Sequence, residues 1–382
     1  MALSVAGSVK PGVIIDIEKR FYQFMIVGKQ KSMLAEDEAA VDDVDIEAGD
    51  KLDIEQQAQQ QRLEKQQQQQ EVFEAVSNQL SATIIDEMKY RFDSLEPLLK
   101  TAPITQKQWQ LLELLNSRNI DLNRLRIAIS DINWLTRELI NVVNSPAFRQ
   151  SRSQNNDVQV TDLKLVLNFI GIEQLKFLIP YFCMRHWLPK KRVSTLWATK
   201  QLWRFANVAA IASRTLSEYH QQNQSVIYTA TLTSMIGATI VIENSALVYE
   251  AIRGTWLREA KNTRNKLVHD AVLSTRFPIQ FLCENVLKHG SLLNWKVLDG
   301  LDCADGQITK IMREIDQTIN FSELSVSSSI VVKSLMYAMK LMLEEQCSIS
   351  PKENRLLFKY FEFSEEEVLR LKAQNFRKQD IL

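Results

Sequence analysis

The 382-residue sequence contains little glycine, cysteine or histidine, and each shortage excludes a class of chemistry. Its ten glycines form no Gly-x-Gly-x-x-Gly or Walker pattern, which excludes phosphate-cradling loops of those kinds. Neither a Gly-x-Ser-x-Gly nucleophile turn nor a His-Glu-x-x-His zinc helix occurs. The four cysteines lie far apart without a Cys-x-x-Cys pair, which argues against a zinc ribbon or a disulfide framework. We therefore expect a reducing, cytoplasmic environment.

Charge of either sign is not in excess. Forty-six Lys and Arg residues balance 46 Asp and Glu residues, so no global field exists to attract DNA, RNA or an anionic membrane. We expect no nucleic-acid partner. The alternative, a nucleic-acid or membrane-associated regulator, needs a local basic patch, for which the candidates are Lys190, Lys191, Arg192, Lys200 and Arg204.

The first residues lack the pattern of a targeting segment, because the apolar run Val13-Ile14-Ile15 is short and ends at Asp16. A long uncharged stretch lies between Glu218 and Glu243, but it begins with polar residues and contains several Thr and Ser side chains. A membrane-spanning helix needs about 20 predominantly apolar residues. We therefore expect a buried core helix in this stretch and no membrane span.

Composition and periodicity divide the chain into five parts. Residues 1–31 hold two runs of strand-favouring side chains, which indicate a small hairpin, a peptide that docks onto another surface, or a tail folded back on its own domain. Residues 32–70 are acidic and then Gln-rich, a composition that favours a partly disordered linker, with helix at most near the Gln run. Helical periodicity dominates afterwards and predicts an all-α fold: an N-terminal subdomain (71–190), a second subdomain (191–300) and a C-terminal extension (301–382).

Local signals place several helix boundaries. Capping boxes at Thr105 to Gln108 and at Ser364 to Glu367 predict helix starts, the second for a solvent-facing terminal helix. Gly171 suits the end of a helix. The apolar stripe of the 330–345 helix, which includes Met339 and Met342, is expected in the core rather than in a partner groove. Further helices are expected over 226–242, 246–270 and 278–288.

Histidine is too scarce for an ordinary binuclear hydrolase site, which needs several His and carboxylate ligands from different helices. His269-Asp270 ends a charged run without a second His at helical spacing, which favours a surface or capping pair. His289 precedes Gly290 and is expected near a helix C-terminus, where a cation is favoured. A residual phosphohydrolase that uses His269, Asp270 and His289 stays as an alternative.

Three segments together resemble the HDOD family, the HD-related output domains, which are similar to metal-dependent His-Asp phosphohydrolases. The first segment ends in Asn144-Ser145, and the second is a capped apolar helix that reaches Ile170-Gly171. The third joins the helix around Trp203 to the stretch that ends at Gly237. The resemblance covers roughly residues 95–290 and implies a helical HD-like frame.

The chain departs from this pattern at the positions of the metal ligands. Active relatives tend to carry a His two residues after the Trp and a His-Asp pair before the Ile-Gly, whereas this chain has Phe205, Ser234 and Met235. An aromatic ring, a hydroxyl and a thioether do not replace imidazole and carboxylate as ligands of a hard divalent ion. The resemblance therefore implies no catalytic residue, no metal and no cofactor.

The resemblance also implies a regulatory role rather than turnover. Domains of this family are bacterial signalling modules that act through protein-protein interaction, here with an unidentified signalling protein. A tether formed by residues 32–70 would raise the effective concentration of residues 1–31 at that partner, so removal of residues 1–70 is expected to abolish partner capture. The sequence leaves the oligomeric state open.

Overall fold

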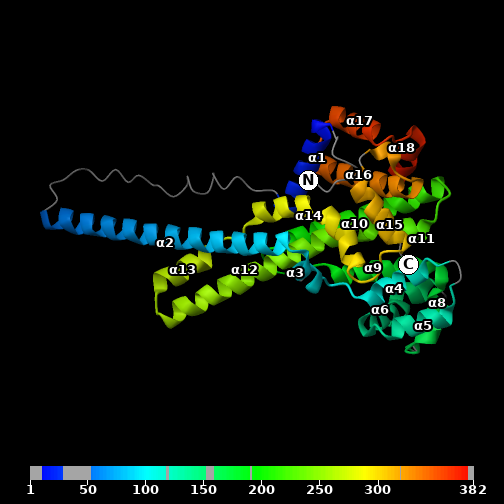
Figure 1. The fold of residues 1–382 in the computed structure, drawn as a ribbon, viewed down its shortest axis with the longest axis horizontal. Coiled ribbons are helices and arrows are strands. Elements are labelled where there is room, and N and C mark those ends of the chain that lie inside the picture. Colours follow the sequence, from blue (N-terminus) through cyan, green and yellow to red (C-terminus); the bar gives the residue numbers. More distant parts are fainter. Residues whose placement is uncertain are drawn as a thin grey trace.

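A computed structural model describes residues 11–28, 53–117, 120–151, 159–189, 192–318 and 320–376, and these residues form helices without any strand, which confirms the all-α prediction (Figure 1). The helices are α1 (Gly12–Ile26), α2 (Asp53–Asp93), α3 (Leu95–Lys100), α4 (Gln106–Leu115), α5 (Leu122–Ser130), α6 (Asn133–Val143), α7 (Pro146–Ser151), α8 (Leu163–Ile170), α9 (Ile172–Trp187), α10 (Leu196–Tyr219), α11 (Gln224–Thr233), α12 (Ile236–Asn262), α13 (Lys266–Ser274), α14 (Ile279–Asp299), α15 (Gln307–Gln317), α16 (Val326–Glu345), α17 (Pro351–Tyr360) and α18 (Glu365–Lys372), with a 3₁₀ turn at Phe321–Glu323.

Helices α4 to α9 form a small bundle at one end of the molecule (Figure 1). The capping box at its entrance is present as predicted, with the Thr105 hydroxyl accepting from the Gln108 amide and the Gln108 side chain accepting from the Thr105 amide. Gly171 ends α8 as predicted, with a φ of 80°. This left-handed conformation favours glycine, and it turns the chain by 108° into α9.

The main body is built around α10, α11, α14, α16 and the first half of α12. The stripe of α16, formed by Val331, Leu335, Met339 and Met342, is 4% exposed or less, which confirms its place in the core. The break expected near residues 242–246 is wrong, because α12 runs unbroken from Ile236 to Asn262. The chain breaks instead at Ser234 and Met235, between α11 and α12.

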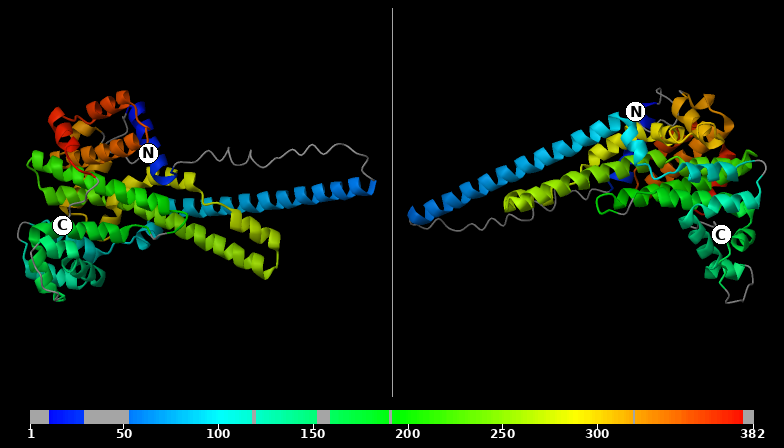
Figure 2. Two further views of the ribbon diagram at one scale, coloured as in Figure 1. Left: turned by 180° about the vertical axis from the view of Figure 1, so that it is seen from behind. Right: turned by 60° about the horizontal axis from the view of Figure 1, so that its bottom comes forward.

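A long arm projects from the body and consists of α2, the outer half of α12 and α13 (Figures 1 and 2). Helix α2 has 41 residues and is therefore about 60 Å long. The side chains of residues 61–75 are exposed. The helix expected near the Gln run is present, and it is the outer part of one continuous helix that runs on to Asp93. The rest of the predicted linker, residues 32–52, lies outside the described residues.

The expected N-terminal hairpin is wrong, because Gly12–Ile26 forms helix α1. Ile14, Ile17, Phe21 and Met25 recur at helical spacing and are 2% exposed or less. This 3.6-residue period decides the conformation over the strand preference of the individual side chains. Helix α1 packs on α10, α14, α16 and α17, so these residues belong to the core of the body rather than to a free tail.

Helices α17 and α18 close the C-terminal end of the body. The predicted capping box at Ser364 is present, but the helix that it starts is not merely solvent-facing. Glu367 is 1% exposed and Leu371 is 0% exposed, since α18 packs on α10. Helix α18 is therefore anchored in the body by one polar and one apolar side chain.

Two helical stretches, Gln224–Asn262 and Val326–Glu345, are long and apolar enough by length and composition to cross a membrane. In this fold, 100% of the apolar window of the first and 78% of that of the second are buried. The pair α8 and α9 would pass the same test only as a bent unit. The apolar character of these helices is used for packing within the protein.

Candidate functional site

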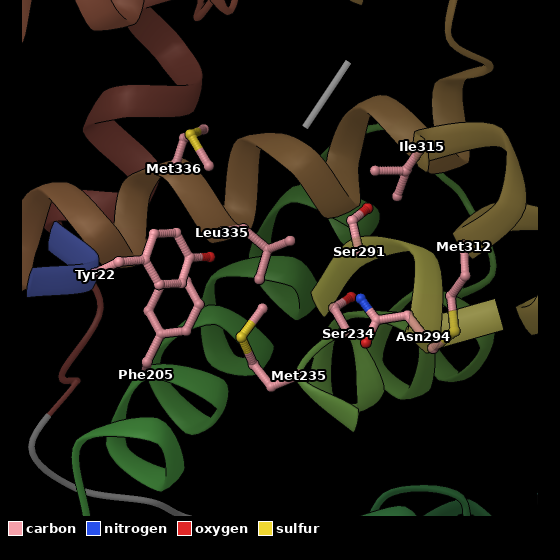
Figure 3. A pocket seen from close by; sticks show the side chains of 10 residues that line it. All are labelled: Tyr22, Phe205, Ser234, Met235, Ser291, Asn294, Met312, Ile315, Leu335 and Met336. Atoms are coloured by element: carbon pink, nitrogen blue, oxygen red, sulfur yellow. The ribbon is translucent and has the colours of Figure 1, made fainter. Parts of the chain in front are cut away.

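One cavity is lined by Phe205, Ser234 and Met235, the three residues predicted to replace metal ligands (Figure 3). Phe205 comes from α10, and Ser234 and Met235 form the break between α11 and α12. The cavity has a volume of about 30 Å³, which is room for one or two water molecules. The fold thus gathers at one point the three residues that the sequence comparison predicted to replace metal ligands.

None of the three side chains fits a hard divalent ion. Phe205 is 1% exposed, and its ring centroid lies 4.8 Å from that of Phe21. The Ser234 hydroxyl donates to the Ala230 carbonyl oxygen at 2.7 Å, and Met235 is 2% exposed with only a soft thioether sulfur to offer. A catalytic Zn²⁺, Mg²⁺ or Mn²⁺ prefers imidazole and carboxylate ligands. The donor set at this position therefore does not match the metal of the phosphohydrolases.

The other residues that line the cavity were not predicted from the sequence. Ser291 and Asn294 belong to α14, and the other side chains come from the two ends of the chain: Tyr22, Met312, Ile315, Leu335 and Met336. No short motif could have found them, because they lie at least 50 residues from Ser234 along the chain. The wall contains hydroxyl, amide, thioether and apolar groups, and no His or carboxylate side chain.

Tyr22 is the contribution of α1 to the cavity (Figure 3). Burial is the main reason that its pKa lies well above the usual value, and the Glu18 carboxylate raises it further. The phenol is therefore neutral at physiological pH and acts as a hydrogen-bonding group rather than an anionic ligand. Tyr22 closes the cavity on the side of α1.

Gly237 explains why α12 and α14 approach so closely beside the cavity. A Cβ atom at this position would lie 1.9 Å from the Gly290 carbonyl oxygen and 3.0 Å from Leu293 Cβ. The Gly237 amide donates to Asn294 Oδ1 at 2.7 Å, so a side chain of α14 satisfies a free donor at the start of α12. Gly237 thus sets the spacing between α12, which follows Met235, and α14, which carries Asn294.

Asn144 and Ser145 are structural rather than cavity-lining residues. Asn144 Oδ1 accepts from the Val160 amide at 2.9 Å, and its Nδ2 donates to the Val160 carbonyl oxygen at 2.8 Å. These bonds join the end of α6 to the segment that leads into α8. The Ser145 hydroxyl accepts from the Phe148 amide at 3.3 Å at the start of α7.

Ile170 and Trp203 also serve packing. Ile170 is 3% exposed beside Gly171, at the turn between α8 and α9. Trp203 is half-buried, with its ring centroid 4.9 Å from that of Tyr181 on α9. Through this contact Trp203 connects α10 to the N-terminal bundle.

The alternative site does not assemble. His269 Nδ1 lies 3.5 Å from Asp270 Oδ1 on α13 in the arm, and both side chains are exposed. His289 lies in the middle of α14, not near its C-terminus as predicted, and stacks on Phe92 at 5.7 Å. Burial and the neighbouring Lys288 lower its pKa, so it stays neutral. Among the described residues, no group of three or more His, Cys, Asp or Glu side chains could hold a metal ion.

Two of the five residues of the candidate basic patch form ion pairs within the fold. Arg192 pairs with Glu243 at 2.6 Å and with Glu250 at 2.8 Å, and Arg204 pairs with Glu345. Lys200 is exposed. Lys190 and Lys191 lie outside the described residues. The two arginines that the fold places are thus neutralised by carboxylates of the same chain.

Comparison with known proteins matches residues 102–274 to the model of the HDOD domain family. No curated protein matches the chain. Among solved structures, it is similar to the crystal structure of a protein named "Putative metal-dependent phosphohydrolase" from Shewanella amazonensis SB2B. That match has 16% sequence identity and a TM-score of 0.39, and it covers 78% of this chain and 99% of the other.

Proposed function

We propose that this chain, whose residues 102–274 form an HDOD domain, is a non-catalytic regulatory protein that acts in bacterial signalling by binding other proteins. The supporting observation is the cavity at the degenerate ligand positions. Phe205, Ser234 and Met235 supply no suitable ligand, and Tyr22 and Leu335 from the two ends of the chain close the space where a substrate would need access.

Helix α1, the described part of residues 1–31, is not available to a partner as a free tethered peptide. The apolar face of α1 is already buried against the body, so truncation of residues 1–70 would remove part of the core. Partner surfaces must instead be sought among exposed apolar side chains. Phe73 on the arm is 38% exposed, and Ile127 and Leu165 on the N-terminal bundle are 63% and 48% exposed.

The absence of catalysis is tested on the purified full-length chain. Metal analysis by plasma mass spectrometry and assays with generic phosphomonoesters and phosphodiesters are expected to show substoichiometric metal and no turnover above buffer. Metal binding that disappears in His269→Ala or His289→Ala would favour the residual phosphohydrolase. Turnover that persists in both variants would also contradict the proposal.

Protein binding is tested by photo-crosslinking in cells that naturally express the chain. A photoreactive residue is placed at Phe73, at Ile127 or at Leu165, with exposed Tyr90 (70%) as a matched site on the inner part of α2. We expect one of the first three positions to capture a single signalling protein repeatedly, while the other positions do not. The same background of abundant proteins at all four positions would contradict the proposal.

A further inference from the structure

Positive charge is concentrated at the outer end of the hairpin formed by α12 and α13. Residues 253–276 contain six Lys and Arg side chains against two Asp and Glu side chains, in a chain without net charge. Four of the six lie within residues 258–266, which form the basic turn, and all four are exposed: Arg258, Lys261, Arg264 and Lys266. The balance of charge over the whole chain therefore conceals a local excess on the arm.

The four basic side chains are not neutralised as the arginines of the body are. Arg192 and Arg204 pair with carboxylates of α12 and α16. In the basic turn, by contrast, no Lys or Arg forms an ion pair with another described residue. Arg258 donates instead to the Thr255 hydroxyl at 3.2 Å. These charges remain available to an anionic partner.

Hydrogen bonds hold the basic turn in one conformation. The Arg264 amide donates to the Lys261 carbonyl oxygen at 3.2 Å, and the Asn265 amide donates to the Ala260 carbonyl oxygen at 3.0 Å. The Asn265 side chain also accepts from the Val268 amide at 3.2 Å, which caps the start of α13. The turn is thus tight, and its basic side chains project from a rigid backbone.

The inner end of the hairpin is fixed to the base of the arm. The Tyr249 hydroxyl donates to the Thr275 carbonyl oxygen at 2.8 Å, and the Thr275 and Ser77 hydroxyls lie 3.2 Å apart. Arg253 donates to the Leu273 carbonyl oxygen at 2.7 Å. Helix α13 packs on α2, and the basic turn stands clear of the main body (Figures 1 and 2). An extended partner therefore meets the turn without meeting the body.

The residue types of the basic turn fit a phosphate backbone. Residues 261–266 read Lys-Asn-Thr-Arg-Asn-Lys, and these are side chains that contact phosphate and sugar in nucleic-acid complexes. A surface that enters a membrane needs an apolar face beside its cations. Ala260 is 4% exposed, and Leu267, just after the turn, is a single apolar side chain at 42% exposure. The composition therefore favours a nucleic acid over a membrane.

Helix α2 adds neutral hydrogen-bonding side chains beside the turn. Helices α2 and α13 both run towards the body, and Ser77 lies level with Thr275 (Figure 1). At 1.5 Å per residue in both helices, the start of α13 lies about nine residues farther out along α2. Residues 66–70 there are all Gln and all exposed, whereas Glu71 and Glu74 lie farther in, beside α13. Gln side chains also contact phosphates and base edges.

We propose that the basic turn is a contact surface for the phosphate backbone of a nucleic acid. Recognition is independent of sequence, because the phosphates are the same at every base pair. Four phosphate contacts give a slope of about −3.6 for the logarithm of the binding constant against that of the salt concentration on a duplex. Affinity then falls about 100-fold between ~50 and ~200 mM salt. This surface goes beyond the proposed signalling role, and either proposal can fail without the other.

Fluorescence anisotropy of the full-length chain with a labelled mixed-sequence DNA duplex, and with a single-stranded RNA of the same length, tests the proposal. The test variant carries four substitutions in the basic turn: Arg258→Gln, Lys261→Gln, Arg264→Gln and Lys266→Gln. The control makes the same change of net charge at exposed side chains on other helices: Arg124→Gln, Arg126→Gln, Lys164→Gln and Lys352→Gln. Circular dichroism checks that both variants are folded.

We expect the test variant to weaken binding at least ~30-fold at low salt and the control to weaken it less than ~3-fold, because only the former removes phosphate contacts. Binding of the duplex alone or of the RNA alone would identify which nucleic acid the turn prefers and would support the proposal. Equal weakening by the two variants would overturn it. Absence of salt-dependent binding of both nucleic acids to the intact protein would also overturn it.

Lysine acetylation of the unsubstituted protein provides a second, independent measurement. Mass spectrometry follows the modification rates of Lys261 and Lys266, with exposed Lys352 as the reference. Bound nucleic acid should slow the first two at least about fivefold, since phosphate contacts cover their amines. Unchanged rates would overturn the proposal. Protection by phosphatidylglycerol vesicles but not by nucleic acid would overturn it in favour of a membrane surface.

Discussion

Removal of Lys333 should destabilise the C-terminal end of the body strongly, because it leaves a buried carboxylate without its cation. Lys333 Nζ donates to both oxygens of Glu367, at 2.8 and 2.9 Å, and to the Glu362 carbonyl oxygen at 2.8 Å. The side chains of Lys333 and Glu367 are 11% and 1% exposed. Loss of one partner of a buried pair costs about 3–5 kcal/mol. We expect the lower end of that range for Lys333→Met, since Glu367 keeps the contact with His220 at 2.7 Å and the Ser364 amide.

The assay is urea unfolding followed by far-ultraviolet circular dichroism at pH 7, with hydrogen exchange to locate the loss at α18. Lys100→Met is the matched control, because it breaks the Lys100–Glu96 pair, whose side chains are 72% and 75% exposed and whose loss is therefore expected to leave the urea midpoint nearly unchanged. The double variant Lys333→Met/Glu367→Leu should recover most of the lost stability, since the uncompensated charge is gone. A loss below about 1 kcal/mol for Lys333→Met would refute the reasoning.

Because of the Glu367 carboxylate, we expect the free energy of unfolding to fall at acid pH. Burial alone would raise the pKa of Glu367, but hydrogen bonds from Lys333, His220 and the Ser364 amide outweigh it and hold the pKa below its usual range. The folded state therefore binds this proton less readily than the unfolded chain. Its stabilising contribution is complete above the unfolded pKa of about 4.3 and is lost as the pH falls through the folded value. Glu367→Gln should remove this part of the acid dependence, and an unchanged acid profile would contradict the assignment.

Two further predictions concern family-motif residues. Gly237→Ala should lower the free energy of unfolding in urea by at least about 2 kcal/mol, because the new Cβ would overlap the Gly290 carbonyl oxygen. Gly254→Ala in the same helix is the control, since a Cβ there meets nothing within 4 Å and should be neutral or stabilising. Equal effects of the two substitutions would refute the close-contact argument. Asn144→Ala should cost about 2 kcal/mol and speed amide exchange at Val160, since it removes both bonds to that residue, and unchanged exchange would show that the bonds do not hold this segment.

Glycine shows why only part of the fold follows from the sequence. Gly171 was correctly predicted to end a helix, and its positive φ of 80° is one that glycine adopts at little cost. The same reasoning at Gly290 placed His289 at a helix end and was wrong, because α14 continues to Asp299; the backbone carbonyl of Gly290 instead lies where Gly237 lets α12 approach. A helix stop and a helix crossing both require a missing side chain, and local sequence does not distinguish them.

The expected boundary between residues 242 and 246 is absent because the polar residues there fit inside a helix. The Asn244 and Ser245 side chains donate to the Ile240 and Val241 carbonyl oxygens of the preceding turn and remain inside α12. Only some of the residues that line the cavity could be predicted from the sequence. Phe205, Ser234 and Met235 followed from a motif, whereas Tyr22 and Leu335 reach the cavity through contacts between distant segments, which no local pattern encodes.

Helix α12 begins beside Met235 at the cavity wall and ends within the arm at Asn262, without an internal break, whereas α2 reaches farther out (Figure 1). Its 27 residues make a rigid rod of about 40 Å. A tilt of about 5° at the Met235 end would carry the far end through about 3 Å, by the geometry of a rod of that length. One continuous helix thus joins the cavity wall to the arm, so the packing beside Met235 and the position of the turn between α12 and α13 are set by the same element.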